Sequence, residues 1–154
     1  MTNTWVILPV IPGDTGLPGR FENVPTVAAA MAVIGRAERA AVGRPFLVRI
    51  QDRHDRMKWI DVGVCPWGWA MLCLDDFVPN TSDYFVSRGD SDSAEEWEFE
   101  QPCGQSMQLP RKSFVDGDKL KRALSVYLVT RKLWRGLRWQ PTLDPLLLAD
   151  EPDA

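Results

Sequence analysis

Apolar residues recur at helical spacing in two segments of the chain, which predicts two amphipathic helices. The first follows an N-cap at Thr26 and ends at Gly43 and Pro45. Its apolar positions are Val27, Ala30, Met31, Ile34 and Ala41. The second follows a cap at Asp116 or Asp118. Its apolar positions are Leu120, Ala123, Leu124, Tyr127 and Leu128.

Between these helices the apolar pattern changes to a period of two, which predicts β-strands. The expected strands cover residues 46–50, 57–64, 69–74, 84–87 and 97–100, with further short strands at 5–8 and 137–139. Short connections between successive strands favour an antiparallel meander. We therefore expect an α+β fold, in which a mostly antiparallel sheet of about five to six strands carries both helices on one face.

The chain of 154 residues is long enough for one domain with its own hydrophobic core. Prolines and glycines in residues 1–23 predict an extended N-terminal arm, residues 24–139 form the domain, and residues 140–154 form an acidic tail that frays. The net charge of −3 argues against a general nucleic-acid-binding protein. No basic leader or long uncharged apolar run is present, so we expect a cytoplasmic protein without a membrane span.

No segment shows a recognisable catalytic or metal-binding pattern, so we expect no cofactor and no enzymatic activity. His54 is the single histidine and lies in the polar segment 51–56, which we interpret as a hairpin tip. The glycine-rich segment 13–19 lacks the Lys-Ser/Thr pair of a phosphate loop. The cysteines are odd in number and form no Cys-x-x-Cys pair, which predicts reduced, mostly buried thiols. They are Cys65, Cys73 and Cys103.

Two further motifs have a structural and a functional interpretation. Trp67-Gly68-Trp69 resembles a stacking platform for a sugar or base, but the apolar run behind it favours a strand that enters the core. A group of basic residues on and around the second helix is interpreted as a solvated face rather than a nucleic-acid contact. These residues are Lys119, Lys121, Arg122, Arg131, Arg111, Lys112, Lys132, Arg135 and Arg138.

The densest charge feature is an acidic loop that runs into a strand. Its acids are Asp90, Asp92, Glu95, Glu96, Glu98 and Glu100, and Asp75, Asp76 and Asp83 extend it upstream. Three interpretations are open: a solvated surface, a patch for a basic partner, and a cation or acid–base site. Aromatic residues beside charges are typical of binding hot spots, which favours the partner. The expected contact residues are Tyr84, Asp90, Asp92, Glu95, Glu96, Trp97 and Glu98.

From Pro45 to Trp139 the order of elements resembles immunity protein family one of bacterial polymorphic toxin systems. The matching features are the strand pair 57–74, the aromatic strand ending in Ser-Arg-Gly at 84–89, the acidic strand 97–100, Leu109-Pro110, the Ala-x-x-x-Tyr-Leu helix at 123–128, and the strand ending at Trp139. After the helix the family often has Thr-Gly, whereas this chain has Thr130-Arg131.

The resemblance implies a cytoplasmic inhibitor that is not an enzyme and that blocks a cognate toxin domain, often a deaminase or nuclease. Toxins that act on nucleic acids present basic clefts, which an acidic loop would attract and fill. Two alternatives are a structural or adaptor subunit of a secretion or phage-like assembly, and a metal-dependent hydrolase that uses the acidic loop. The sequence leaves a monomer and a dimer equally open.

Overall fold

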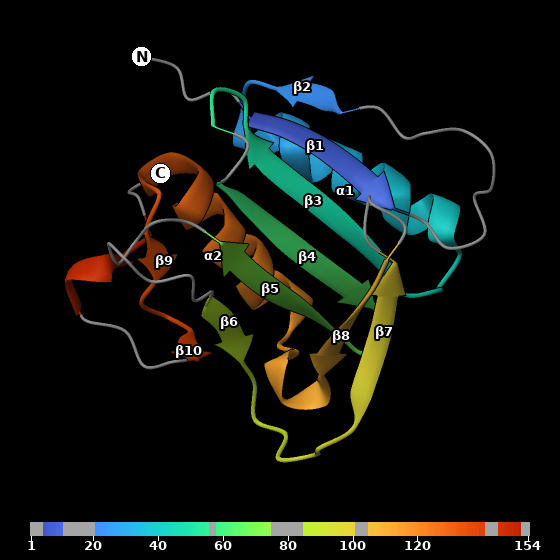
Figure 1. The fold of residues 1–154 in the computed structure, drawn as a ribbon. Coiled ribbons are helices and arrows are strands. Elements are labelled where there is room, and N and C mark those ends of the chain that lie inside the picture. The colour runs from blue at the N-terminus through green and yellow to red at the C-terminus, as the bar shows by residue number, and fades with distance from the viewer. Residues whose placement is uncertain are drawn as a thin grey trace.

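Three strands with alternating apolar residues form the centre of the sheet: β3 (Phe46–Asp52), β4 (Trp59–Cys65) and β5 (Gly68–Leu74). The computed structural model describes residues 5–10, 21–55, 58–74, 85–100, 105–140 and 145–151. On one side the sheet continues with β1 (Trp5–Val10) and β2 (Glu22–Val24), and on the other with β6 (Phe85–Arg88) and β10 (Arg138–Gln140). All seven strands are antiparallel to their neighbours, in the order β10-β6-β5-β4-β3-β1-β2 (Figure 1).

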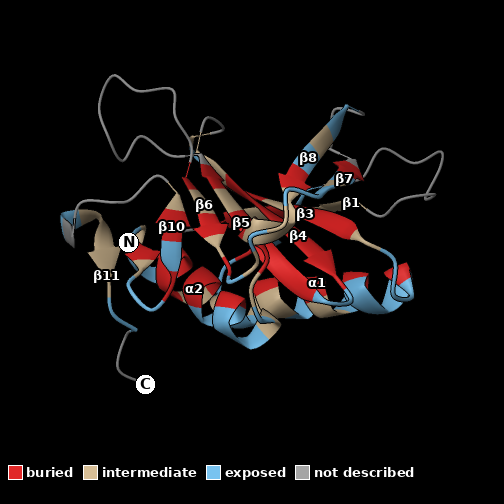
Figure 2. Cartoon of the chain, turned by 90° about the horizontal axis from the view of Figure 1, so that it is seen from below, coloured by how far each residue is buried: buried red, intermediate tan, exposed pale blue. Residues whose placement is uncertain are grey.

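Two helices cover one face of this sheet (Figure 2). Helix α1 (Val27–Ala41) begins where the Thr26 side chain accepts a hydrogen bond from the Ala29 amide, and α2 (Gly117–Thr130) begins at Asp116, whose carboxylate accepts from the Asp118 amide. Of the two predicted caps, the residue that caps is therefore Asp116. The α+β fold with both helices on one face is confirmed, and the main sheet has seven strands rather than about five to six.

The opposite face of the sheet is covered in part by a separate hairpin of β7 (Glu96–Glu100) and β8 (Ser106–Pro110) (Figure 2). The expectation that residues 97–100 extend the meander is wrong, because β7 pairs with β8 and leaves the sheet. Phe99 and Leu109 are buried from this side. Gly63 permits the close approach, since a Cβ there would lie 3.0 Å from a methyl carbon of Leu109.

Residues near both ends of the chain belong to the fold. β1 pairs with β3 over six residues, and Trp5 and Ile7 are buried, so the strand expected at 5–8 is longer and lies inside the sheet. After α2 the chain forms β9 (Leu133–Trp134), which pairs in parallel with β11 (Leu148–Ala149) beyond the short helix η2 (Pro145–Leu147). This described part of the C-terminal segment, expected to fray, therefore packs on the domain.

The two cysteines that the structure describes, Cys65 and Cys73, are buried, as expected, and Cys103 lies outside the described residues. Burial raises the pKa of the Cys65 thiol from 9.0 to about 12. Neither α1 nor α2, the longest helices among the described residues, is long and apolar enough to cross a membrane.

We predict that native Cys65 resists alkylation. With a pKa of about 12, only about one thiol in ten thousand is ionised at pH 8, and only the thiolate reacts. Iodoacetamide at pH 8, followed by peptide mass spectrometry, should leave Cys65 unmodified in the folded protein and modify it fully in guanidinium chloride. Equal labelling rates in both states would contradict the prediction.

A charged pair lies on the hairpin side of the sheet. Arg49 in β3 and Asp61 in β4 are directly opposite, and their side chains form two hydrogen bonds of 2.8 Å. The Asp61 side chain is 1% exposed. Burial raises the pKa of Asp61, while the Arg49 guanidinium and a hydrogen bond from Trp59 act in the opposite direction. Each charge is therefore tolerated at this position because the other compensates it.

Asp61→Asn should lower the free energy of unfolding by about 3 kcal/mol, because it leaves the Arg49 charge buried beside a neutral partner. Replacing both residues, with Arg49→Met and Asp61→Leu, should cost less than Asp61→Asn alone. Urea unfolding of the three proteins measures both effects. A double variant less stable than the single one would show that the pair contributes more than mutual compensation.

Candidate functional site

The acidic loop, residues 89–95, begins where β6 ends against the short helix η1 (Arg111–Ser113). The Ser87 hydroxyl is buried; it donates to the Ser113 carbonyl at 2.7 Å and accepts from the Met71 amide at 3.0 Å. The Gly89 amide donates to the Lys112 carbonyl at 2.6 Å. A Cβ at Gly89 would overlap the carbonyl oxygen of Phe114, so this position requires glycine.

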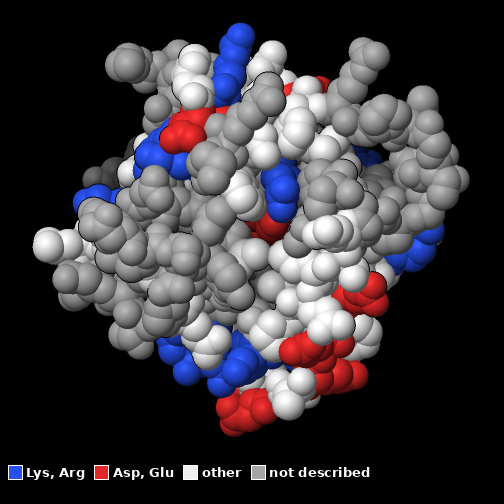
Figure 3. Space-filling view, viewed as in Figure 1, with Lys and Arg blue, Asp and Glu red and all other residues white. Residues whose placement is uncertain are grey.

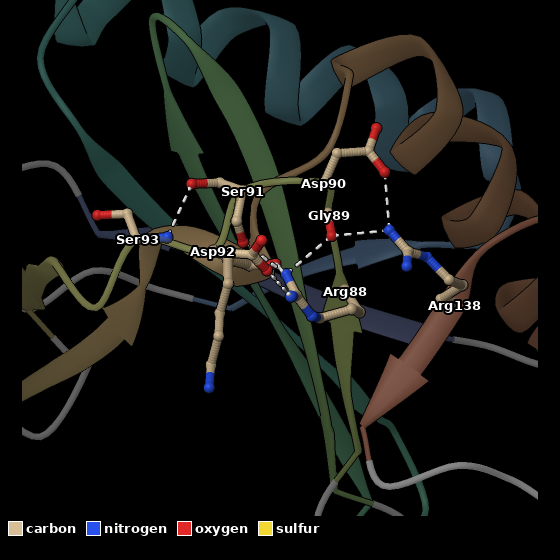
Figure 4. A network of polar contacts seen from close by, with 8 residues as sticks. Arg88, Gly89, Asp90, Ser91, Asp92, Ser93 and Arg138 are labelled. Carbon is tan, nitrogen blue, oxygen red and sulfur yellow. Dashed lines mark hydrogen bonds and ion pairs between the residues drawn. The ribbon is translucent and has the colours of Figure 1, made fainter.

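Arg88 holds the loop from within (Figure 4). Its Nη1 donates to the carbonyls of Gly89, Ser91 and Lys112 at 2.8, 2.7 and 3.1 Å. Its Nη2 pairs with the Asp92 carboxylate at 3.0 Å. One planar guanidinium thus satisfies four acceptors, which a lysine could not do with the same geometry.

Other contacts complete the loop. Arg138 in β10 donates through Nη2 to the Gly89 carbonyl at 3.0 Å and to the Asp90 carboxylate at 2.7 Å (Figure 4). The Ser91 and Ser93 hydroxyls each accept from the amide two residues ahead, a common serine turn. The Arg111 amide then donates to the Glu95 carbonyl at 2.8 Å. The backbone of the loop is therefore ordered before any partner binds.

The exposed acids fall into two groups. The side chains of Asp90 and Asp92 are 100% and 95% exposed, but each pairs with an arginine. Glu95, Glu96 and Glu98 are also exposed, and among the described residues no Lys or Arg forms an ion pair with them. We call these three the glutamate strip. Figure 3 shows the carboxylates gathered at the lower edge of the molecule, over the β6–β7 loop and β7.

Among the described residues, the aromatic residue exposed beside these acids is Trp67 and not the expected Trp97. Trp97 lies on the inward side of β7 and is half-buried, and its indole N–H has no hydrogen-bond partner among the described residues. Its ring lies 4.5 Å from that of Trp67, which is 37% exposed in the turn between β4 and β5. Of the Trp67-Gly68-Trp69 motif, only Trp69 enters the core. Tyr84 lies outside the described residues.

The preferred interpretation of Trp67-Gly68-Trp69 as a strand that enters the core is wrong for Trp67, because Pro66 and Gly68 on either side are turn residues that place it at a hairpin tip. A groove of about 330 Å³ lies beside it, between the acidic loop and the first turn of α2. We call this the loop–helix groove. Its basic residues come from four elements, so no local pattern in the sequence predicts the groove. They are Arg88, Arg111, Lys119 and Arg138.

The hairpin tip at His54 is organised by Asp52. Its carboxylate accepts from the His54 amide at 2.7 Å and the Asp55 amide at 3.2 Å, and it pairs with Arg131. Among the described residues, no three His, Cys, Asp or Glu side chains are placed to hold a metal ion. Compared with protein-family models and with curated proteins, the chain matches none.

Arg88→Lys should loosen the acidic loop, because an ammonium cannot reach the four acceptors that the guanidinium holds. We expect hydrogen exchange at the Gly89, Ser93 and Glu95 amides to accelerate by about tenfold or more, and unfolding free energy to fall by about 1–3 kcal/mol. Arg36→Lys, which alters an exposed pair with Glu22, is the matched control. Unchanged exchange at the three amides would contradict the assigned role of Arg88.

Proposed function

We propose that this protein is a cytoplasmic immunity-type inhibitor that binds a cognate bacterial toxin domain and blocks it by stoichiometric occlusion. The observation that carries the proposal is the glutamate strip: three exposed carboxylates without cationic partners among the described residues, on an ordered loop and strand. The resemblance over Pro45 to Trp139 points in the same direction. In this proposal the protein is no enzyme and does not contact nucleic acid directly.

The strip suits a basic partner because its charge is available without rearrangement. Alternation along β7 turns Trp97 and Phe99 toward the sheet, so Glu96 and Glu98 face away from it. A Lys or Arg of the partner can pair with them without displacing an internal cation. Long-range attraction between opposite charges raises the association rate, and an ordered loop loses little entropy on binding.

The acids expected at the site then have two different roles. Asp90 and Asp92 are neutralised by Arg138 and Arg88, so they mainly shape the loop. The electrostatic attraction of a basic partner comes from Glu95, Glu96 and Glu98. Trp67, held against Trp97, offers the apolar anchor that the proposal needs beside the charges.

The partner to test is the product of the gene adjacent to this protein's own gene. If it is toxic when expressed alone, co-expression of this protein should restore growth, and the two chains should purify as a one-to-one complex. A harmless neighbour that forms no complex would argue against the immunity function. Assembly of this protein with particle components instead would favour the structural or adaptor alternative.

With the complex in hand, replacing Glu95, Glu96 and Glu98 by Gln should slow association by about tenfold at low ionic strength and flatten its salt dependence. Stopped-flow fluorescence at several salt concentrations measures both. A matched control removes the same charge elsewhere, through Glu22→Gln, Glu38→Gln and Asp150→Asn, all exposed. Equal rates for the two triple variants would show that net charge, and not the strip, governs association.

A further inference from the structure

The loop–helix groove has a surplus of positive charge beside the glutamate strip. Its four basic residues face two carboxylates, Asp90 and Asp116. Both carboxylates have partners: Asp90 pairs with Arg138, and Asp116 accepts the Asp118 amide at 2.7 Å. The charge of the groove is therefore cationic, opposite in sign to the strip that borders it.

Arg111 and Lys119 carry this surplus. Arg88 is occupied by the loop carbonyls and Asp92, and Arg138 by Asp90 and the Gly89 carbonyl. Over the ranges that the structure describes, neither Arg111 nor Lys119 forms an ion pair. They line the same groove from different elements, η1 and α2, so both can attract carboxylates of a ligand bound there.

Trp67 adds an apolar wall to the groove. Its ring lies 4.5 Å from Trp97 and 5.8 Å from Phe114, which fixes its orientation. A partly exposed ring that is already held in place can bind an apolar side chain at small entropic cost. The groove thus combines two available cations with one fixed aromatic surface.

From these observations we infer that the loop–helix groove binds an acidic peptide segment of the protein partner, whose carboxylates pair with Arg111 and Lys119. The inference extends the proposed function, in that the same partner would place basic residues on the glutamate strip and acidic residues in the groove. Two adjacent patches of opposite sign fix the orientation of a partner more strongly than one patch does.

Nucleic acid fits this surface less well than an acidic protein segment. A nucleic-acid strand carries one phosphate per nucleotide, so a strand in the groove would carry its next phosphates toward the bordering glutamates. Glu95 is adjacent to the groove, since its backbone carbonyl accepts a hydrogen bond from the amide of Arg111, which lines the groove. In a protein segment, by contrast, the acidic residues can be confined to the part that lies in the groove.

The test uses a blocked tetraglutamate peptide and the full chain labelled with ¹⁵N. Titration should shift the Lys119 and Gly136 amides and the Trp67 indole resonance. Replacing Arg111 and Lys119 by Gln should weaken the binding of the peptide by about tenfold or more. The matched control, Arg53→Gln with Lys132→Gln, removes two exposed charges elsewhere and should bind as the wild type does. An otherwise unchanged spectrum of each variant establishes that it is folded.

Three results of this titration would overturn the inference: no shifts at millimolar peptide, equal losses in both double variants, or tighter binding of a ten-nucleotide single strand at the same residues. A second arm repeats the titration with Glu95, Glu96 and Glu98 replaced by Gln. Retained peptide binding there supports a separate groove site, and lost binding overturns it. Because the proposed function is tested through those glutamates and the adjacent gene product, either hypothesis can fail without the other.

Discussion

The backbone of residues 111–115 is the constraint on which the arrangement of the site depends. β6 pairs with β5 at only two positions and then diverges, and this segment takes its place beside Trp69. Trp69 and Val115 exchange hydrogen bonds of 2.8 and 2.7 Å. Buried backbone groups must be paired, so the segment has little freedom to lie elsewhere. Phe114 packs on the hairpin side and Val115 on the helix side, so the chain passes here from one face of the sheet to the other.

Residues 111–115 therefore position three parts of the site together: the acidic loop, the β7–β8 hairpin and the start of α2. Ser87 and Gly89 bond to Ser113 and Lys112, which anchors the loop at its beginning. Arg111 bonds to Glu95, which anchors it at its end. A surface loop that is tied at both ends to the core can present charges in fixed positions, as a binding surface requires.

Charged residues serve different purposes in this structure. Arg49 and Asp61 compensate each other on the sheet, and Arg88 and Arg138 satisfy loop carbonyls as much as carboxylates. The charges of these four residues are compensated by interactions within the protein. The charges left for a partner are those of the glutamate strip and of Arg111 and Lys119. The two groups adjoin where the Arg111 amide donates to the Glu95 carbonyl, so the face of the molecule around Trp67 is bipolar and not simply acidic.

The sequence by itself determined both helices, the Thr26 cap and most strands of the sheet, because spacing and capping act locally. It also predicted buried cysteines, and Cys65 and Cys73 are buried. It left Asp116 and Asp118 open as the second cap, and the structure shows that Asp116 caps α2. Only the tertiary structure decided that β7 leaves the sheet, since a period of two reports a buried face and not what buries it. It also decided which acids are compensated: Asp90 meets Arg138 across 48 residues of sequence. Packing of the β7–β8 hairpin on the sheet turns Trp97 inward against Trp67, which stays 37% exposed.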